Sequence, residues 1–316
     1  MKIGRYLSLR QETRLGAVVE IAGELHVVDL SRAHTARCGR PDGGLTSMSA
    51  LMAGGRAGLD EAARTATWAA ARPDADWLAQ ERDVQWLVPL EPRNVIAGGM
   101  NFARHREEVI RVNGPGQSHT DFPMGFVKLA QSLVPTRASV ARPRGVLQFD
   151  YEIEVAAVIG REAHDIDESR ALEHVFGYTI MNDLSARELQ MREMANQSIV
   201  LGKNFPGFGP LGPWILTADE VPDPSVLALE LRVNGELRQR SSCRDLIFGF
   251  PAMVSHWSRM GLAPGDLLTT GTPEGIALAR KPDPTPFFLK PGDIVEAEVP
   301  QIGILETRIV DAAAAA

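Results

Sequence analysis

The chain has 316 residues, of which 44% are hydrophobic and 23% charged, and its formal net charge is −7 at pH 7. This length suits one large domain, or a large domain with a smaller one, and the composition is ordinary for a globular protein. The negative charge argues against nonspecific binding to nucleic acids. No apolar run approaches the roughly 18 residues of a membrane-spanning helix, and residues 1–10 lack the apolar segment of a secretory signal. Two cysteines without a spacing motif, Cys38 and Cys243, favour a reducing, cytoplasmic setting.

Residues 1–90 are expected to form a small N-terminal α/β domain. Two stretches, 2–9 and 14–30, have the pattern of short strands, and an Ala-Gly-Glu turn interrupts the second. Apolar residues between 46 and 72 are spaced for two helices with glycines between them. The proline-containing stretch 73–92 is typical of a linker, which places a domain boundary near residue 90.

Strand patterns dominate the second part of the chain, residues 91–311. Strands are expected at 94–101, 126–130, 148–160 and 176–183, and a hairpin at 227–240 that turns at Asn234–Gly235. Short helices are expected at 102–114, 185–197 and 249–261, the second opened by a capping box of Ser185 and Glu188. Because strands and helices do not alternate, the pattern predicts a β-rich α+β domain and argues against a doubly wound parallel sheet. Residues 312–316 are expected to be a frayed tail.

One strand, residues 148–160, carries an unusual pair of carboxylates. Glu152 and Glu154 stand at i and i+2, so they point to the same face about 7 Å apart. The residues that follow are apolar on both faces, which indicates a strand buried on both sides. Carboxylates that enter such a core must be paired, protonated or bound to a metal, and one hard divalent cation is the simplest solution. The alternative is an edge strand with two solvated glutamates.

Several motifs that would indicate other chemistry are missing from the sequence. It has no G-x-S-x-G nucleophile elbow, and Gly202–Lys203 lacks the upstream glycine of a phosphate-binding loop. No G-x-G-x-x-G opens a helix after a strand, and no Cys/His cluster has zinc-ligand spacing. The sequence therefore does not indicate a serine hydrolase, a nucleotide cofactor or a zinc site.

Six segments, in order, carry a family resemblance: GGMNFARHREE, FDYEIEVAAVIG, GYTIMNDLSARELQ, LGKNFPGFGPLGP, LAPGDLLTTGTPEG and LKPGDIVEAEVPQIG. Together they span about residues 92–310 and resemble the fumarylacetoacetate hydrolase family, including its acylpyruvase and 2-hydroxyhepta-2,4-diene-1,7-dioate isomerase-like members. The resemblance implies a mixed β-roll catalytic domain, a smaller N-terminal domain and a homodimer. Two positions depart from the family pattern, because Phe102 replaces a tyrosine and Ala277 a glycine.

The resemblance also implies a role for each matching residue. One Mg²⁺ or Mn²⁺ per subunit would be bound by Glu152, Glu154 and Asp183. A general base, His105, would be oriented by Glu108. The remaining positions would stabilise an oxyanion (Gln190 and Lys203) or surround the substrate carboxylate and the outer shell of the metal (Lys128, Arg187 and Thr272).

Each of these residues also has an ordinary structural explanation. His105 could be a solvated histidine, and Glu108 a surface partner of Arg104. Asp183 could cap the helix that follows it, whose exposed face could carry Arg187 and Gln190. Lys203 could be an exposed loop lysine, and Thr272 could cap a turn. A metal-stabilised binding protein without turnover is a further alternative.

Family substrates are typically acylpyruvates, and the implied reaction is hydrolysis of a carbon–carbon bond. A water molecule activated by His105 would attack the distal carbonyl, and a pyruvate enolate would leave at the metal. The same site could serve a decarboxylase, hydratase, isomerase or tautomerase of a related 2-oxo acid in a catabolic pathway. The substrate side chain is not predicted, and neither nucleic acid nor a membrane is expected as a partner. The segment 112–121, after the helix with His105, is predicted to act as a lid.

Overall fold

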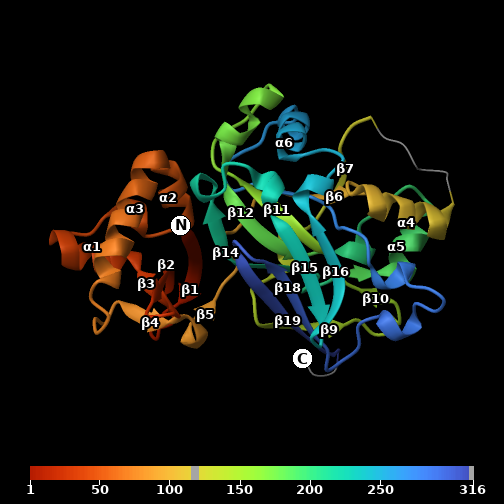
Figure 1. Ribbon diagram of the computed structural model, residues 1–316, viewed down its shortest axis with the longest axis horizontal. Coiled ribbons are helices and arrows are strands. Elements are labelled where there is room, and N and C mark those ends of the chain that lie inside the picture. The colour runs from red at the N-terminus through yellow and green to blue at the C-terminus, as the bar shows by residue number, and fades with distance from the viewer. Residues whose placement is uncertain (115–120, 313–316) are drawn as a thin grey trace.

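The computed structural model describes residues 1–114 and 121–312. Strands make up most of the regular structure in these ranges, as the sequence predicts for a β-rich α+β protein (Figure 1). In chain order they are β1 (Lys2–Leu7), β2 (Thr13–Ile21), β3 (Glu24–Asp29), β4 (Leu78–Gln80), β5 (Gln85–Trp86), β6 (Val95–Gly99), β7 (Met124–Val127), β8 (Leu133–Val134), β9 (Ala138–Arg142), β10 (Phe149–Asp150), β11 (Ile153–Ile159), β12 (Val175–Asn182), β13 (Ser185–Ala186), β14 (Gly209–Thr217), β15 (Ala228–Val233), β16 (Glu236–Ser242), β17 (Leu267–Thr269), β18 (Ile294–Val299) and β19 (Gly303–Asp311). The α-helices are α1 (Leu30–Cys38), α2 (Met48–Ala53), α3 (Gly55–Ala70), α4 (Ala103–Asn113), α5 (Arg187–Met194) and α6 (Phe250–Ser258).

A 12-stranded sheet runs through the whole molecule, in the order β4-β3-β2-β1-β14-β12-β11-β17-β6-β7. Strand β5 pairs with β1, and β8 pairs with β14. Most neighbours in this sheet are antiparallel, including β1 and β14, where Lys2 lies opposite Leu216. Residues 1–90 therefore carry their own helices α1–α3 but share a sheet with the rest of the chain (Figure 1).

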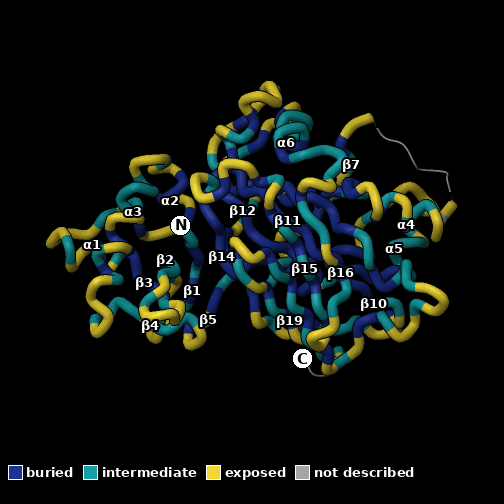
Figure 2. Tube along the Cα trace, in the orientation of Figure 1, coloured by how far each residue is buried: buried dark blue, intermediate teal, exposed yellow. Residues whose placement is uncertain are grey.

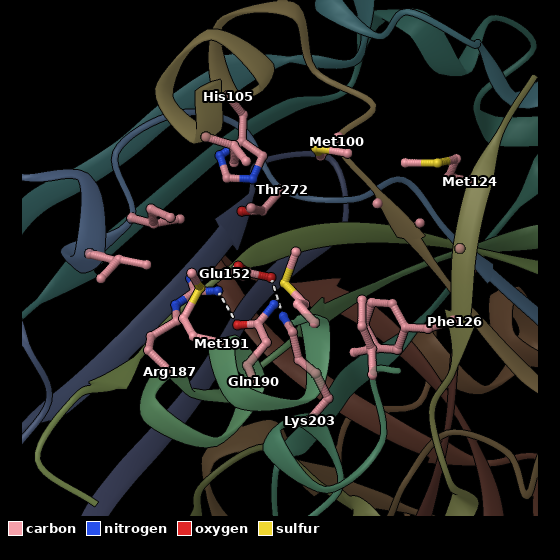
Figure 3. Close-up of a pocket in the computed structure, with 18 of the residues that line it drawn as sticks. Met100, His105, Met124, Phe126, Glu152, Arg187, Gln190, Met191, Lys203 and Thr272 are labelled. Carbon is pink, nitrogen blue, oxygen red and sulfur yellow. Dashed lines mark hydrogen bonds and ion pairs between the residues drawn. The ribbon is translucent and has the colours of Figure 1, made fainter. Parts of the chain in front are cut away.

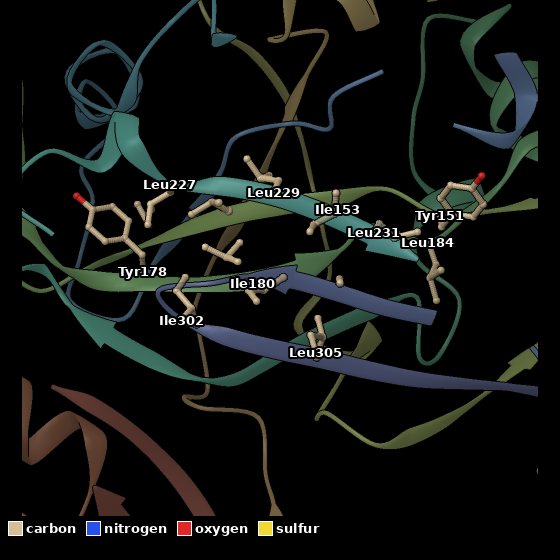
Figure 4. Packing of buried hydrophobic residues seen from close by; sticks show 14 of the residues in the cluster. Tyr151, Ile153, Tyr178, Ile180, Leu184, Leu227, Leu229, Leu231, Ile302 and Leu305 are labelled. Carbon is tan, nitrogen blue, oxygen red and sulfur yellow. The ribbon is translucent and has the colours of Figure 1, made fainter. Parts of the chain in front are cut away.

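The hydrophobic core lies on both faces of the central strands. On one face, Ile153 of β11 and Ile180 of β12 pack against Leu229, Leu231 and Leu305 of the five-stranded sheet β16-β15-β18-β19-β9 (Figure 4). On the other face, alternate residues of β11 join the core that α1–α3 complete. Every residue of β11 is buried, which confirms the expectation of a strand enclosed on both sides (Figure 2).

Local signals correctly located several turns and helix ends. The hairpin β15–β16 turns at Asn234 and Gly235, whose φ angles of 52° and 79° are both positive, as a type I′ turn requires. Helix α6 lies within the predicted range, and Gly261 follows it with φ 79°. No α-helix in the described part of the chain combines the length and the apolarity that crossing a membrane requires.

Two local predictions were wrong, the capping box and the linker, and one helix was missed. Ser185 does not cap α5, because it pairs with Asp150 in the β10–β13 ladder and the helix begins only at Arg187. Glu188 accepts hydrogen bonds from the backbone of residues 147 and 148 instead of closing a capping box. The predicted linker contains β4 and β5, and helix α1 was not predicted, although Asp29 caps it through a bond from the Arg32 N–H.

Candidate active site

Three carboxylates meet where β11 begins and β12 ends. Pairing of these strands places Ile153 opposite Asn182, and the Asp183 N–H donates to the Glu152 carbonyl at 2.8 Å. As a result, Glu152, Glu154 and Asp183 each offer a carboxylate oxygen within 4.8 Å of the other two, and all three residues are buried. These are the three residues that the family resemblance implies as ligands.

Two buried lysines neutralise part of this negative charge. The Lys203 ammonium donates to Glu152 and to Asp183, both at 2.7 Å. Lys128 donates to the other oxygen of Asp183 and to the Lys203 carbonyl. Burial lowers the pKa of Lys203, but the charges of Asp183 and Glu152 outweigh it and raise that pKa above its ordinary value. For the acid Glu152 burial has the opposite effect and raises the pKa, but the positive charges of Lys203 and Arg187 outweigh it and hold that pKa well below its ordinary value.

Glu154 differs from its neighbours because one of its oxygens has no partner. Its Oε2 accepts from the Thr269 hydroxyl and from the Gly271 N–H. Its Oε1 is buried and has no hydrogen-bond donor within the described residues. Burial, Asp183 and Glu152 together raise the pKa of Glu154 well above its ordinary value. An unpartnered carboxylate oxygen facing two further carboxylates fits a hard divalent cation, so this triad could hold a metal.

Arg187, at the start of α5, is held by a second buried carboxylate. Its Nε donates to Asp150 at 2.8 Å, its Nη1 to Gln190 at 2.8 Å and its Nη2 to Glu152 at 2.6 Å. Asp150 also accepts from the backbone N–H groups of Ala277 and Leu278, at 2.8 and 3.1 Å. Asp150 therefore ties the guanidinium to the 275–280 segment.

His105 lies on the first turn of α4 and points into the site. Its Nδ1 is 3.4 Å from an oxygen of Glu108, and both side chains are largely buried. Glu108 accepts in turn from the Gly275 N–H at 3.0 and 3.1 Å, whereas Arg104 pairs with Glu274. Glu108 is thus a buried partner of the histidine and not a surface partner of Arg104.

Gly275 has a conformation that favours glycine. Its φ is +102°, and a β-carbon at this position would collide with the Arg238 carbonyl oxygen. The segment that follows is also anchored, because the Arg280 side chain donates to the backbone carbonyls of Arg238 and Gly275. One short segment therefore supplies N–H groups to the partners of both His105 and Arg187.

A cavity of about 570 Å³ opens over these groups (Figure 3). Six of the residues that the resemblance implies line it: His105, Glu152, Arg187, Gln190, Lys203 and Thr272. The other four, Glu108, Lys128, Glu154 and Asp183, lie behind this lining and contact it. For Lys128 this position corresponds to an outer shell around the carboxylates and not to contact with a ligand in the cavity.

Sequence reasoning missed two residues that hold the site together. Asp150 had a usable signal, because it continues the i, i+2 spacing of Glu152 and Glu154. Gln239 had none: it donates to the Thr272 hydroxyl at 2.8 Å and accepts from the Ile153 N–H at 3.0 Å, across a long separation in the chain. The predicted lid falls partly on residues 115–120, outside the described residues, and helix α4 before it is formed.

Comparison with known proteins identifies relatives that cover most of the chain. Residues 94–310 match the family model for the fumarylacetoacetate (FAA) hydrolase C-terminal domain. The mitochondrial oxaloacetate tautomerase fahd2 of Xenopus laevis is 38% identical over 226 residues, which cover 71% of this chain and 68% of that protein.

Two solved structures share the fold over nearly their full length. The fumarylacetoacetate hydrolase of Exiguobacterium antarcticum has a TM-score of 0.74 and 31% identity, covering 98% of this chain and 99% of that one. The maleylpyruvate hydrolase of Sphingobium, solved in complex with manganese(II) and pyruvate, has a TM-score of 0.71 and 26% identity, with coverage of 98% and 99%. With the buried carboxylate triad and the mixed sheets, these matches show that the chain is an enzyme of the fumarylacetoacetate hydrolase family.

Proposed function

We propose that this enzyme hydrolyses a carbon–carbon bond of an acylpyruvate-type 2,4-dioxo acid. The products would be pyruvate and a carboxylic acid. One observation carries the proposal: the same cavity is lined by Glu152 of the carboxylate triad and by His105, a histidine held by Glu108. This arrangement supplies a base beside a place where a 2-oxo acid can bind.

His105 is the group that activates water. Because its Nδ1 faces Glu108, its Nε2 is left to take a proton from a water molecule in the cavity. The resulting hydroxide attacks the distal carbonyl, and the bond between that carbon and the pyruvate methylene breaks. The proton held on His105 then passes to the released carbon, which completes pyruvate.

The other lining residues bind and orient. Lys203 and Gln190, which line the cavity, would donate to the oxyanion that forms at the distal carbonyl, an effect that can contribute roughly 3–4 kcal/mol per donor. Mg²⁺ or Mn²⁺, held by Glu152, Glu154 and Asp183, would bind the 2-oxo acid end and stabilise the charge that develops there. The manganese and pyruvate in the Sphingobium enzyme support this assignment.

The direct test uses acetylpyruvate with Mg²⁺, followed by loss of the ultraviolet absorbance of the enol. Products are identified by NMR, with an EDTA control and the variants His105→Asn and Glu107→Gln. We expect release of pyruvate and acetate that depends on the metal. The variant His105→Asn should lose this activity, whereas Glu107→Gln should keep it, because Glu107 is exposed on α4. Mg²⁺ binding without release of pyruvate from any acylpyruvate would contradict the hydrolase assignment.

A second candidate is tautomerisation of an oxo acid, favoured by the 38% identity to the Xenopus oxaloacetate tautomerase. This reaction needs a base to move a proton between carbon and oxygen, and no water is consumed. Accelerated decay of enol oxaloacetate in the absence of acylpyruvate hydrolysis would support it. The same set of assays should also measure the other alternative reactions, which are decarboxylation of oxaloacetate and hydration or isomerisation of a dienoate.

Assembly and location stay predictions. We propose a homodimer in the cytoplasm, which the family resemblance and the sequence favour. Light scattering on the purified protein tests the dimer, and a monomer at working concentration would contradict it.

A further inference from the structure

The charged groups of the cavity lie around the carboxylate triad, where Lys203 also lies over the ring of Phe126 at 5.4 Å. The charged residues that line it are His105, Glu152, Arg187 and Lys203, all of which belong to the site around the carboxylate triad. Farther from this group, the wall is largely apolar and rich in methionine. Its principal members are Met100, Met124, Phe126, Met191, Met194 and Leu278, which we call the methionine wall.

Helix α5 shows this change of polarity along one face. Arg187, Gln190, Met191 and Met194 all line the cavity, and their spacing of three and four residues places them on the same side of the helix. Arg187 lies at the carboxylate end, and Met194 lies about 10 Å farther along the helix axis. A bound molecule that starts at the triad and follows α5 therefore passes from Arg187 to Met191 and Met194, and beyond them the lining continues with the uncharged residues Gln197, Ser198 and Ile199.

The second half of the methionine wall comes from the sheet. Met100 directly follows β6, and Met124 and Phe126 lie on β7. Figure 3 shows these three residues along one side of the cavity, opposite Arg187, with Glu152 between them. Two elements that are distant in sequence thus contribute apolar side chains to one cavity.

Within residues 1–114 and 121–312, the lysine and arginine side chains of the cavity lining are already paired with carboxylates at the triad. The arginine in the lining is Arg187 and the lysine is Lys203. Arg187 is engaged by Asp150, Gln190 and Glu152, and Lys203 by Glu152 and Asp183. A carboxylate placed against the methionine wall would lose water without gaining a partner, and this desolvation is costly.

We propose that the acyl group of the substrate is uncharged and apolar, and that the methionine wall binds it. The substrate class is thus a monocarboxylic 2,4-dioxo acid with a hydrocarbon tail, in contrast to a dicarboxylic one. Methionine is unbranched and flexible, so the wall adapts to tails of different length. This inference rests on the proposed function for the reaction, but the binding preference can be measured without turnover.

The kinetic test compares butyrylpyruvate with succinylpyruvate, which differ by a terminal methyl group in place of a carboxylate. We expect kcat/KM to be at least about 100-fold higher for butyrylpyruvate. Along the series from acetylpyruvate to hexanoylpyruvate, it should rise about fourfold per added methylene. Equal or faster hydrolysis of succinylpyruvate would overturn the proposal.

The binding test separates this inference from the reaction. Calorimetry with the Mg²⁺-loaded enzyme compares 2-oxooctanoate with 2-oxooctanedioate, neither of which has the 4-oxo group needed for hydrolysis. Tighter binding of the monocarboxylate supports the methionine wall even if no acylpyruvate is cleaved. Equal or weaker binding of the monocarboxylate overturns it even if hydrolysis is confirmed.

A charge placed in the wall should reverse the preference. In Met124→Lys the new ammonium can pair with a distal carboxylate, so the preference for the monocarboxylate should fall at least about tenfold in both assays. The matched control is Met260→Lys, because Met260 is 59% exposed and does not line the cavity. Thermal unfolding verifies that both variants fold. An unchanged preference in a folded Met124→Lys protein would place the acyl group elsewhere and overturn the proposal.

Discussion

The substitution Glu154→Gln should make the metal-free protein more stable while weakening metal binding. In the wild type, Glu154 Oε1 is buried without a hydrogen-bond donor among the described residues, and the Glu154 carboxylate lies close to those of Glu152 and Asp183. The glutamine oxygen can keep the bonds from Thr269 and Gly271, while its amide group turns two N–H donors toward the carboxylates. Removing an unsatisfied buried acceptor is worth about 1–3 kcal/mol, so the free energy of unfolding without metal should rise by about that amount.

The metal-bound protein should respond in the opposite way. Substitutions in the outer shell of a metal site already weaken binding about 10- to 100-fold, so loss of a ligand charge should cost at least about 100-fold. At a Mg²⁺ concentration of about 100 times the wild-type Kd, the metal stabilises the wild type by about 2.7 kcal/mol. A 100-fold weaker site reduces this stabilisation to about 0.4 kcal/mol.

Urea unfolding with Mg²⁺ and with EDTA measures both effects. The control is Glu162→Gln, which removes an exposed carboxylate and should leave both free energies unchanged. A metal-free Glu154→Gln protein that is less stable than the wild type would refute the account of the unpartnered oxygen. Equal stabilisation of both proteins by Mg²⁺ would remove Glu154 from the ligand set.

Three further substitutions test the contacts around the site. Glu108→Gln removes the charge beside the His105 ring and should lower kcat about 100-fold, while Glu107→Gln leaves kcat unchanged. Gly275→Ala should lower the free energy of unfolding, measured with urea, by about 1–3 kcal/mol, because φ is +102° at this position. It should also lower kcat, because the Gly275 N–H donates to Glu108. Asp150→Asn should cost about 3 kcal/mol of stability and raise KM, because a buried guanidinium loses a charged partner.

Each of these three outcomes can be contradicted. Equal kcat for the two glutamine variants on α4 would mean that Glu108 does not orient the histidine. A Gly275→Ala protein of wild-type stability would show that the segment shifts freely. An Asp150→Asn protein with altered stability but an unchanged KM would make Asp150 a purely structural residue, without influence on the cavity.

Much of the site was predictable because its signals are local in sequence. The i, i+2 spacing of Glu152 and Glu154, followed by an apolar run, raised the hypothesis of a buried carboxylate pair, and the family resemblance favoured it over two solvated glutamates. The Asn-Gly dipeptide fixed the hairpin, since its residues favour positive φ. The order of six motifs identified the family, and with it the third carboxylate and the histidine.

The tertiary structure alone decided how these residues are supported and what surrounds them. Gln239 reaches Thr272, and Asp150 joins Arg187 to the 275–280 segment, through contacts that no sequence spacing encodes. The methionine wall combines residues of α5 and β7 with Met100, which follows β6, and only packing brings them to one cavity. Spacing along the chain reports which side chains share a face of one element. Which faces then meet depends on how sheets and helices pack, and this is a property of the whole fold.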